Sequence, residues 1–165
     1  MLNTRRLLCC LTVVRMAAAR GGAGNYDAAR DRMVGELGSS AACAAGDASD
    51  KVILTRGCDP MMAERAGKML PPLLGNVQMI AATDDVHFFE LLASRKFDVV
   101  AFAPGACRFS AAKQTIPGGS LATKTWTLVE YKAKVREHQG EDVPIVETTA
   151  EAEMVPLLRD ALGLP

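Results

Sequence analysis

The fold of this chain is decided by residues 97–107, which read Phe97-Asp98-Val99-Val100-Ala101-Phe102-Ala103-Pro104-Gly105-Ala106-Cys107. No polar residue interrupts the run from Val99 to Ala103, and this run is too short for an isolated helix. A short apolar run that ends at Pro-Gly is typical of a strand buried on both faces of a parallel sheet. We therefore expect a central strand here, with the chain from Lys51 onward arranged around it.

Strand and helix signals alternate along the rest of the chain. Aliphatic and β-branched runs predict strands at residues 51–56, 76–82, 97–103 and 143–148. Helical spacing of apolar residues, with capping residues at the ends, predicts helices at residues 59–70, 83–96, 120–138 and 149–162. The first helix starts with Asp59 as N-cap before Pro60, and we expect Pro71-Pro72 to stop it.

This alternation predicts the fold class. It is typical of an α/β protein, here a three-layer α/β/α domain in which helices cover both faces of a four-stranded parallel sheet. Because crossovers between parallel strands are right-handed, the expected strand order is 2-1-3-4. A chain of 165 residues suits one such domain, over residues 51–165, plus a tail.

The third helix is ambiguous by pattern alone. Residues 129–136 alternate apolar and polar side chains, which is typical of a strand. Glu130 and Lys134 are nevertheless spaced as a helical ion pair, and a helix keeps the alternation of strands and helices. We therefore favour a helix that begins at Ser120 or Thr123.

A long connection is expected before that helix. It runs from Pro104 to about Ala122 and carries Pro117, Gly118 and Gly119. A loop of this length in a compact domain is more often functional or part of an interface than idle. We therefore treat it as a candidate contact surface.

The first 25 residues differ from the rest in charge. All their charged residues are arginines, and the first acidic residue is Asp27. This pattern is typical of a transit peptide and predicts a leader at residues 1–25 that directs import into mitochondria or another organelle. Two alternatives stay open: a secretory signal whose apolar core is residues 7–14, and a misassigned start, with Met16 or Met33 as first residue and a cytoplasmic protein.

Residues 26–50 are rich in Gly, Ala and Ser, with few large apolar groups, and predict a linker or extended arm. Overall, 49% of residues are hydrophobic and 23% charged, which is ordinary for a globular protein. The 19 basic and 19 acidic residues cancel, so the sequence gives no direct signal for nucleic-acid binding. No apolar run reaches the roughly 18–20 residues of a membrane span.

The five cysteines are irregularly spaced, and two of them, Cys58 and Cys107, fall in the predicted domain. An odd number without CxxC spacing argues for a reducing compartment and against a disulfide framework or a zinc site. Neither His87 nor His138 has partners spaced for metal binding, so we expect no metal site. The sequence leaves the cofactor unknown.

The domain from Lys51 onward resembles a response-regulator receiver domain. The resemblance lies in Cys58-Asp59-Pro60 after the first strand, in Phe97-Asp98-Val99-Val100, and in Pro144-Ile145-Val146 followed by Thr149-Ala150. It implies a flavodoxin-like α/β fold.

The chain departs from that family at its chemistry. Ala103 stands where the family places its phospho-accepting aspartate, Asp59 alone stands for the acidic metal-binding pair, and the fifth strand with its lysine has no counterpart. The resemblance therefore implies a receiver-like interaction module without aspartyl phosphorylation.

Cys58 also invites comparison with two small α/β families. In the B subunits of lactose/cellobiose-type sugar phosphotransferases and in low-molecular-weight tyrosine phosphatases, a cysteine at a similar place accepts the phosphoryl group. The phosphatases need an arginine six positions later, where this chain has Glu64. A negative side chain there would repel phosphate, which excludes the phosphatase and leaves phosphocysteine chemistry as a minor alternative.

The candidate site lies where the strand order reverses. In an open parallel sheet, ligands bind beyond the carboxyl ends of the strands at that point, here between the turns after the first and third strands. An anion or nucleotide fragment could be bound there by backbone N–H groups and by a bidentate arginine. The candidate ligand-binding residues are Cys58, Asp59, Gly105, Cys107, Arg108 and Ser110.

Two other interpretations of these residues remain. Cys58 and Cys107 could be small buried hydrophobic residues beside a solvated Arg108, or they could form a redox pair if their Cα atoms lie within about 7 Å.

Two functions follow. The first is a non-catalytic α/β module that works as a subunit or adaptor of a larger, organellar assembly with protein partners. The second is a small flavodoxin-like enzyme or ligand-binding protein that uses the crevice between the first and third strands.

Overall fold

A computed structural model of the protein describes residues 46–165. The predicted leader, residues 1–25, and most of the predicted arm, residues 26–50, lie outside the described residues.

Four parallel strands form the sheet at the centre of the domain. Its order is β2-β1-β3-β4, which confirms the predicted parallel sheet and the predicted order 2-1-3-4. Leu54 pairs with Ile80 on one side and with Val100 on the other, and Val100 pairs in turn with Ile145. The strands are β1 (Val52–Arg56), β2 (Gln78–Ala82), β3 (Val99–Phe102) and β4 (Ile145–Glu147).

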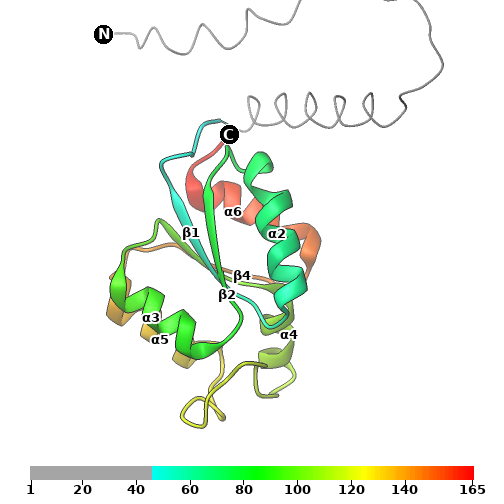
Figure 1. Cartoon of the computed structure of the whole chain (residues 1–165), viewed down its shortest axis with the longest axis vertical. Helices are drawn as coiled ribbons and strands as arrows, with labels where there is room; N and C mark the ends of the chain where they lie inside the picture. The colour runs from blue at the N-terminus through cyan, green and yellow to red at the C-terminus, as the bar shows by residue number, and fades with distance from the viewer. Residues whose placement is uncertain (1–45) are drawn as a thin grey trace, which may run out of the picture.

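Helices cover both faces of this sheet, so the α/β class is also confirmed (Figure 1). Side chains of α2 and α6 pack on one face, and side chains of α3, α4 and α5 pack on the other. The helices are α2 (Pro60–Leu73), α3 (Asp85–Ser94), α4 (Pro104–Ala111), α5 (Leu128–Gln139) and α6 (Met154–Leu162), the last preceded by the 3-10 turn η2 (Glu151–Glu153).

Strand β3 has the buried, central place that its sequence predicts. All four of its residues are buried. Val99 and Ala101 belong to the apolar cluster under α2 and α6, whereas Val100 and Phe102 belong to the cluster under α3 and α5. A strand with a core on each face needs apolar residues at every position, which is why this stretch lacks polar alternation.

The prediction for the end of α2 was wrong. The helix runs through Pro71 and Pro72 and ends at Leu73. The missing N–H groups of the two prolines leave the carbonyls of Gly67 and Lys68 without helical donors, and both of these residues are exposed, so water can take the donors' place. The N–H groups of Leu74 and Asn76 both donate to the Pro71 carbonyl, and these bonds close the helix.

The predicted loop after β3 was also wrong over its first half. Residues 104–111 form helix α4, with Pro104 at its first position. Proline is well suited to that position, because its N–H would be unbonded there in any case, so Pro104 ends the strand and starts a helix at once.

Helix α5 is a helix as predicted, but it begins later, at Leu128. Thr127 and Glu130 form a capping box, in which the Thr127 N–H donates to the Glu130 carboxylate at 2.7 Å. This box fixes the start, and residues 112–127 remain as the connection between α4 and α5.

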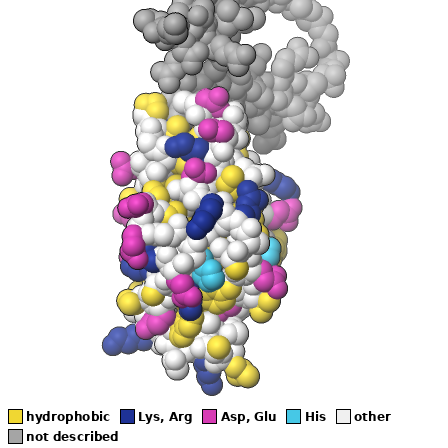
Figure 2. All heavy atoms as spheres, turned by 90° about the vertical axis from the view of Figure 1, so that its left-hand side faces the viewer, with side chains coloured by type: hydrophobic (Ala, Val, Ile, Leu, Met, Phe, Trp, Pro, Cys, Tyr) yellow, Lys and Arg dark blue, Asp and Glu magenta, His cyan; other side chains and the backbone are white. Residues whose placement is uncertain are grey.

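Charges of both signs are mixed over the side of the molecule that carries α3 and α5 (Figure 2). No helix in the described part of the chain combines the length and the hydrophobicity that crossing a membrane requires.

Candidate functional site

The carboxyl ends of β1 and β3 carry the two turns in which the sequence places its candidate residues. These turns do meet. A Cβ atom added to Gly105 would lie 2.7 Å from the Sγ of Cys58, so a larger residue at position 105 would require one of the two turns or the Cys58 side chain to shift. The Cys58 sulfur thus lies between the two turns, at the strand-order reversal where the crevice was expected.

Asp59 is the N-cap residue of helix α2. Its side-chain Oδ1 accepts hydrogen bonds from the N–H groups of Met61 (2.8 Å) and Met62 (3.3 Å) and so caps helix α2. This is the N-cap predicted from the Asp-Pro signal, and it engages one of the two carboxylate oxygens of Asp59.

Arg108 and Ser110 are also engaged. The Arg108 guanidinium is exposed and pairs with Glu151 at 3.1 Å. The Ser110 hydroxyl accepts a 3.0 Å bond from the Leu128 N–H and thereby joins α4 to the first turn of α5.

Cys107 is part of the core. It is 3% exposed, and its Sγ donates to the Phe102 carbonyl at 3.4 Å. Burial raises the pKa of this thiol above its ordinary value, so the thiol is protonated at neutral pH. Cys58 and Cys107 are both free thiols, with Cys58 partly exposed.

An open pocket of about 410 Å³ lies one strand further along, beside the carboxyl end of β4. Four of its lining residues carry hydroxyl groups, the Cys107 thiol forms part of its wall, and Lys132 and Glu147 form a 3.0 Å ion pair within it. The lining residues are Cys107, Ser110, Ala111, Thr127, Leu128, Val129, Lys132, Glu147, Thr148 and Thr149. Of the predicted site residues, this pocket gathers Cys107 and Ser110.

A buried ion pair that was not predicted from the sequence lies at the same edge of the sheet. Arg56, the last residue of β1, is 0% exposed, and Asp85, the first residue of α3, is 1% exposed. Arg56 Nη2 and Nε donate to Asp85 Oδ1 at 2.8 and 3.0 Å. Two opposite charges removed from water in this way need full pairing to be tolerated.

Arg56 and Asp85 make further hydrogen bonds, and these bind the connection between α4 and α5. Arg56 also donates to the Pro117 carbonyl at 2.9 Å, and the hydroxyl of Thr123 donates to the Asp85 carboxylate. The Tyr131 hydroxyl donates to the same carboxylate at 2.8 Å. Among the described residues, no buried side-chain nitrogen or oxygen lacks a partner.

Backbone contacts reinforce this attachment. The Asp85 N–H donates to the Gly118 carbonyl at 2.9 Å. Gly118 has φ +77°, and a Cβ atom there would lie 2.2 Å from the Thr83 carbonyl oxygen, so the close approach requires glycine. The connection is therefore anchored at Pro117, Gly118 and Thr123.

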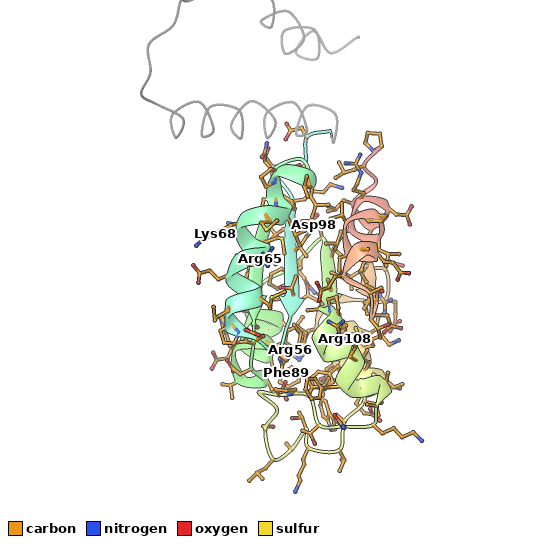
Figure 3. The ribbon with its side chains drawn as sticks, turned by 90° about the vertical axis from the view of Figure 1, so that its right-hand side faces the viewer. Arg56, Arg65, Lys68, Phe89, Asp98 and Arg108 are labelled. Atoms are coloured by element: carbon orange, nitrogen blue, oxygen red, sulfur yellow. The ribbon has the colours of Figure 1, made fainter. Side chains whose placement is uncertain are left out.

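A cluster of aromatic rings lies beside the ion pair and is joined to it by Tyr131. Tyr131 contacts Trp126 with ring centroids 5.4 Å apart and contacts Phe89 at 6.0 Å. Phe102 and Phe88 extend the cluster into the core. Figure 3 shows Arg56 and Phe89 at the same end of the domain. Such apolar surroundings strengthen the attraction between the two charges.

Two signals in the sequence could have revealed the pair. Arg56 is two residues after Leu54, so strand periodicity directs both side chains to the same buried face. Asp85 opens a helix at the neighbouring strand's carboxyl end, which is where an opposite charge can reach that arginine.

The described residues contain no cluster of three or more His, Cys, Asp or Glu side chains that could bind a metal ion. No protein-family model, no curated protein and no solved structure matches this chain.

Proposed function

We propose that this protein is a non-catalytic α/β interaction module that works as a subunit or adaptor of a larger assembly, with residues 112–127 as its contact surface. The observation that carries the proposal is the attachment of this segment to the buried Arg56–Asp85 pair. An ordered surface loses little conformational entropy when a partner binds, so anchoring favours recognition.

The segment presents the side chains that a contact surface needs. Leu121 is 94% exposed, although its neighbour Thr123 is buried against Asp85. Lys113 and Lys124 are exposed in the same segment. This combination fits a partner that offers an apolar pocket with acidic groups at its rim.

Three of the candidate groups at this edge already have partners or places within the chain. Asp59 caps α2, Arg108 pairs with Glu151, and Cys107 is a buried thiol with a raised pKa. These roles support a binding function over a catalytic one.

The proposal includes a receiver-like character, which rests on the sequence resemblance described above. Ala103, at the end of β3, is the N-cap residue of α4 and makes no side-chain cap bond. A methyl side chain cannot accept a phosphoryl group, so signalling by aspartyl phosphorylation is not part of the proposal.

The proposal also places the assembly in mitochondria or another organelle. Its support is the acid-free, arginine-bearing stretch at residues 1–25. The N-terminal peptide of the protein purified from fractionated organelles tests it. A mature chain that begins near residue 26 is expected, whereas an intact leader on a cytoplasmic protein contradicts it.

The experiment that tests the contact surface compares single variants of the tagged full chain in its own cells. Leu121→Asp should abolish stoichiometric co-purification of the partner. Leu157→Asp is the matched control, because Leu157 is also exposed, at 38%, and lies on α6, outside both the segment and the pocket beside β4. Both variants should retain the wild-type melting temperature. Retention of the partner by Leu121→Asp, or the absence of any stoichiometric partner, contradicts the proposal.

A second candidate function is ligand binding, favoured by the hydroxyl-lined pocket beside β4. Its volume of about 410 Å³ falls in the range of small-molecule sites. The test is a thermal-shift screen with nucleotides, flavins and sugar phosphates. A ligand at about 100 times its Kd should stabilise the protein by about 2.7 kcal/mol, and Thr148→Val should remove that shift.

A further inference from the structure

Helix α2 carries an unusual amount of exposed apolar surface. None of its 14 residues is buried. Met61, Met62, Met69 and Leu73 are 80%, 46%, 54% and 40% exposed, and we call these four side chains the α2 stripe. At 100° per residue they lie on one side of the helix, and the half-buried Ala63, Ala66 and Leu70 lie toward the sheet.

One charged residue interrupts the stripe without making it polar. The Arg65 Nε contacts the Met69 sulfur at 3.4 Å, so the stem of Arg65 lies along the same side of the helix. Glu64 and Lys68 pair with each other at 2.5 Å, and Figure 3 shows Arg65 and Lys68 along the outside of α2. An apolar stripe of this length on one helix is typical of a docking surface.

The end of the stripe at Leu73 lies near Gly46, the first residue that the structure describes. Residue 46 lies against Gly75, since a Cβ atom on Gly75 would be 2.5 Å from the Gly46 carbonyl oxygen, and Ala48 donates to the Gly75 carbonyl at 2.8 Å. Gly75 is two residues after Leu73, the last member of the stripe.

The C-terminal end of α6 also lies near Gly46 and Leu73. A Cβ atom on Gly46 would be 3.2 Å from Leu164 and 3.3 Å from Pro165, and the Arg159 guanidinium donates to the Leu73 carbonyl at 3.2 Å. The chain that precedes Gly46 therefore joins the domain between the C-terminal ends of α2 and α6, in the upper part of Figure 1.

The preceding segment is long enough to cover the stripe. From Leu73 to Met61 the helix rises about 18 Å, at about 1.5 Å per residue. An extended chain covers this distance with about six residues, at about 3.3 Å per residue. The 20 residues of segment 26–45 are therefore enough to reach every member of the stripe.

The composition of this segment matches the surface. Tyr26, Ala29, Met33 and Leu37 recur at helical spacing. The same stretch carries three acidic residues, Asp27, Asp31 and Glu36, against two arginines, and an acidic side chain can pair with Arg65 of α2.

We propose that residues 26–45 bind along the α2 stripe of their own chain. The docked segment shields the three methionines and Leu73 from solvent. Tethering at Gly46 supplies a high effective concentration, so the contact forms without a large buried area.

Photocrosslinking tests this contact in the full-length chain. With p-benzoylphenylalanine at position 33 in place of methionine, irradiation should join residue 33 to the peptide that contains Met62 and Met69, within a band of monomer mass. Peptide mapping by mass spectrometry identifies the site. Met69→Glu should lower the crosslink yield about tenfold, because it replaces apolar burial with a charge. Leu157→Glu on α6, at a residue that is 38% exposed, is the matched control and should leave the yield unchanged.

Three results would overturn the proposal: a crosslink to another face of the domain, a band of dimer mass that shows docking on a second copy, or a yield that Met69→Glu does not change. Absence of any crosslink counts against it as well. Circular dichroism of each variant establishes that it is folded, and none of these results depends on a partner at residues 112–127.

Discussion

The guanidinium of Arg56 lies against the carboxylate of Asp85, 29 residues further along the chain, and neither side chain reaches solvent. The pair joins the end of β1 to the start of α3 and, through Pro117 and Thr123, to the connection before α5. The pair therefore fixes the position of this connection over the carboxyl end of the sheet.

Breaking this pair from one side should be strongly destabilising. Arg56→Met leaves the Asp85 charge buried without its partner, and we expect a loss of about 3–5 kcal/mol in the free energy of unfolding. Urea denaturation measures it. Arg65→Met is the control, because the exposed Arg65 should be replaceable with a change within about 0.5 kcal/mol. A similar, small loss in both variants would contradict the importance of the buried pair.

Tyr131 should make stability depend on alkaline pH. Burial, together with the hydrogen bond to Asp85, raises the pKa of Tyr131 from its ordinary 10.0 to about 12. The unfolded chain therefore releases this proton at lower pH than the folded protein does, so the contribution to stability is complete below pH 10 and is lost as the pH rises toward about 12. Denaturation midpoints across this range, compared with those of Tyr131→Phe, measure the effect. Equal pH dependence in both proteins would contradict it.

The contact between Gly105 and Cys58 can be tested as a pair. Gly105→Ala places a Cβ atom 2.7 Å from the Cys58 sulfur and should cost about 1–3 kcal/mol of stability. In a Cys58→Ala background the sulfur is absent, and the same substitution should be nearly neutral. A double-mutant cycle by urea denaturation gives the coupling energy. Additive losses would show that the two turns do not touch.

The two cysteines of the domain should differ in reactivity. Cys58 is partly exposed, whereas Cys107 is buried and its pKa is raised. We expect iodoacetamide at pH 8 to modify Cys58 in the native protein and Cys107 only after unfolding. Peptide mapping separates the two sites from the remaining cysteines. Rapid native labelling of Cys107 would contradict its place in the core.

The sheet was predictable because its signals are local. Val99 to Ala103 could only be a doubly buried strand, and right-handed crossovers then left one favoured strand order. Helix boundaries were less predictable, because the same residue type can end a strand or begin a helix. Pro-Gly after a strand is typical of a loop, but proline is also favoured as the first residue of a helix, and Pro104 is the first residue of α4.

The candidate site was less predictable than the fold, because its contacts join residues far apart in sequence. The position of Cys58 beside Gly105 followed from the topology, but its effect on the crevice depended on side-chain volume at atomic scale. The Thr127 and Glu130 spacing could have given the start of α5, since a capping box is visible in sequence. The partnership of Arg56 and Asp85 required the fold itself.

Gly46 lies next to Pro165, which allows the connectivity of the domain to be changed. In a chain that consists of residues 46–165 alone, a bridge of a few glycines between these two positions would close the backbone into a ring without disturbing any strand pairing. The ring could then be reopened at the exposed turn of residues 140–142, to give a circular permutant with the same architecture.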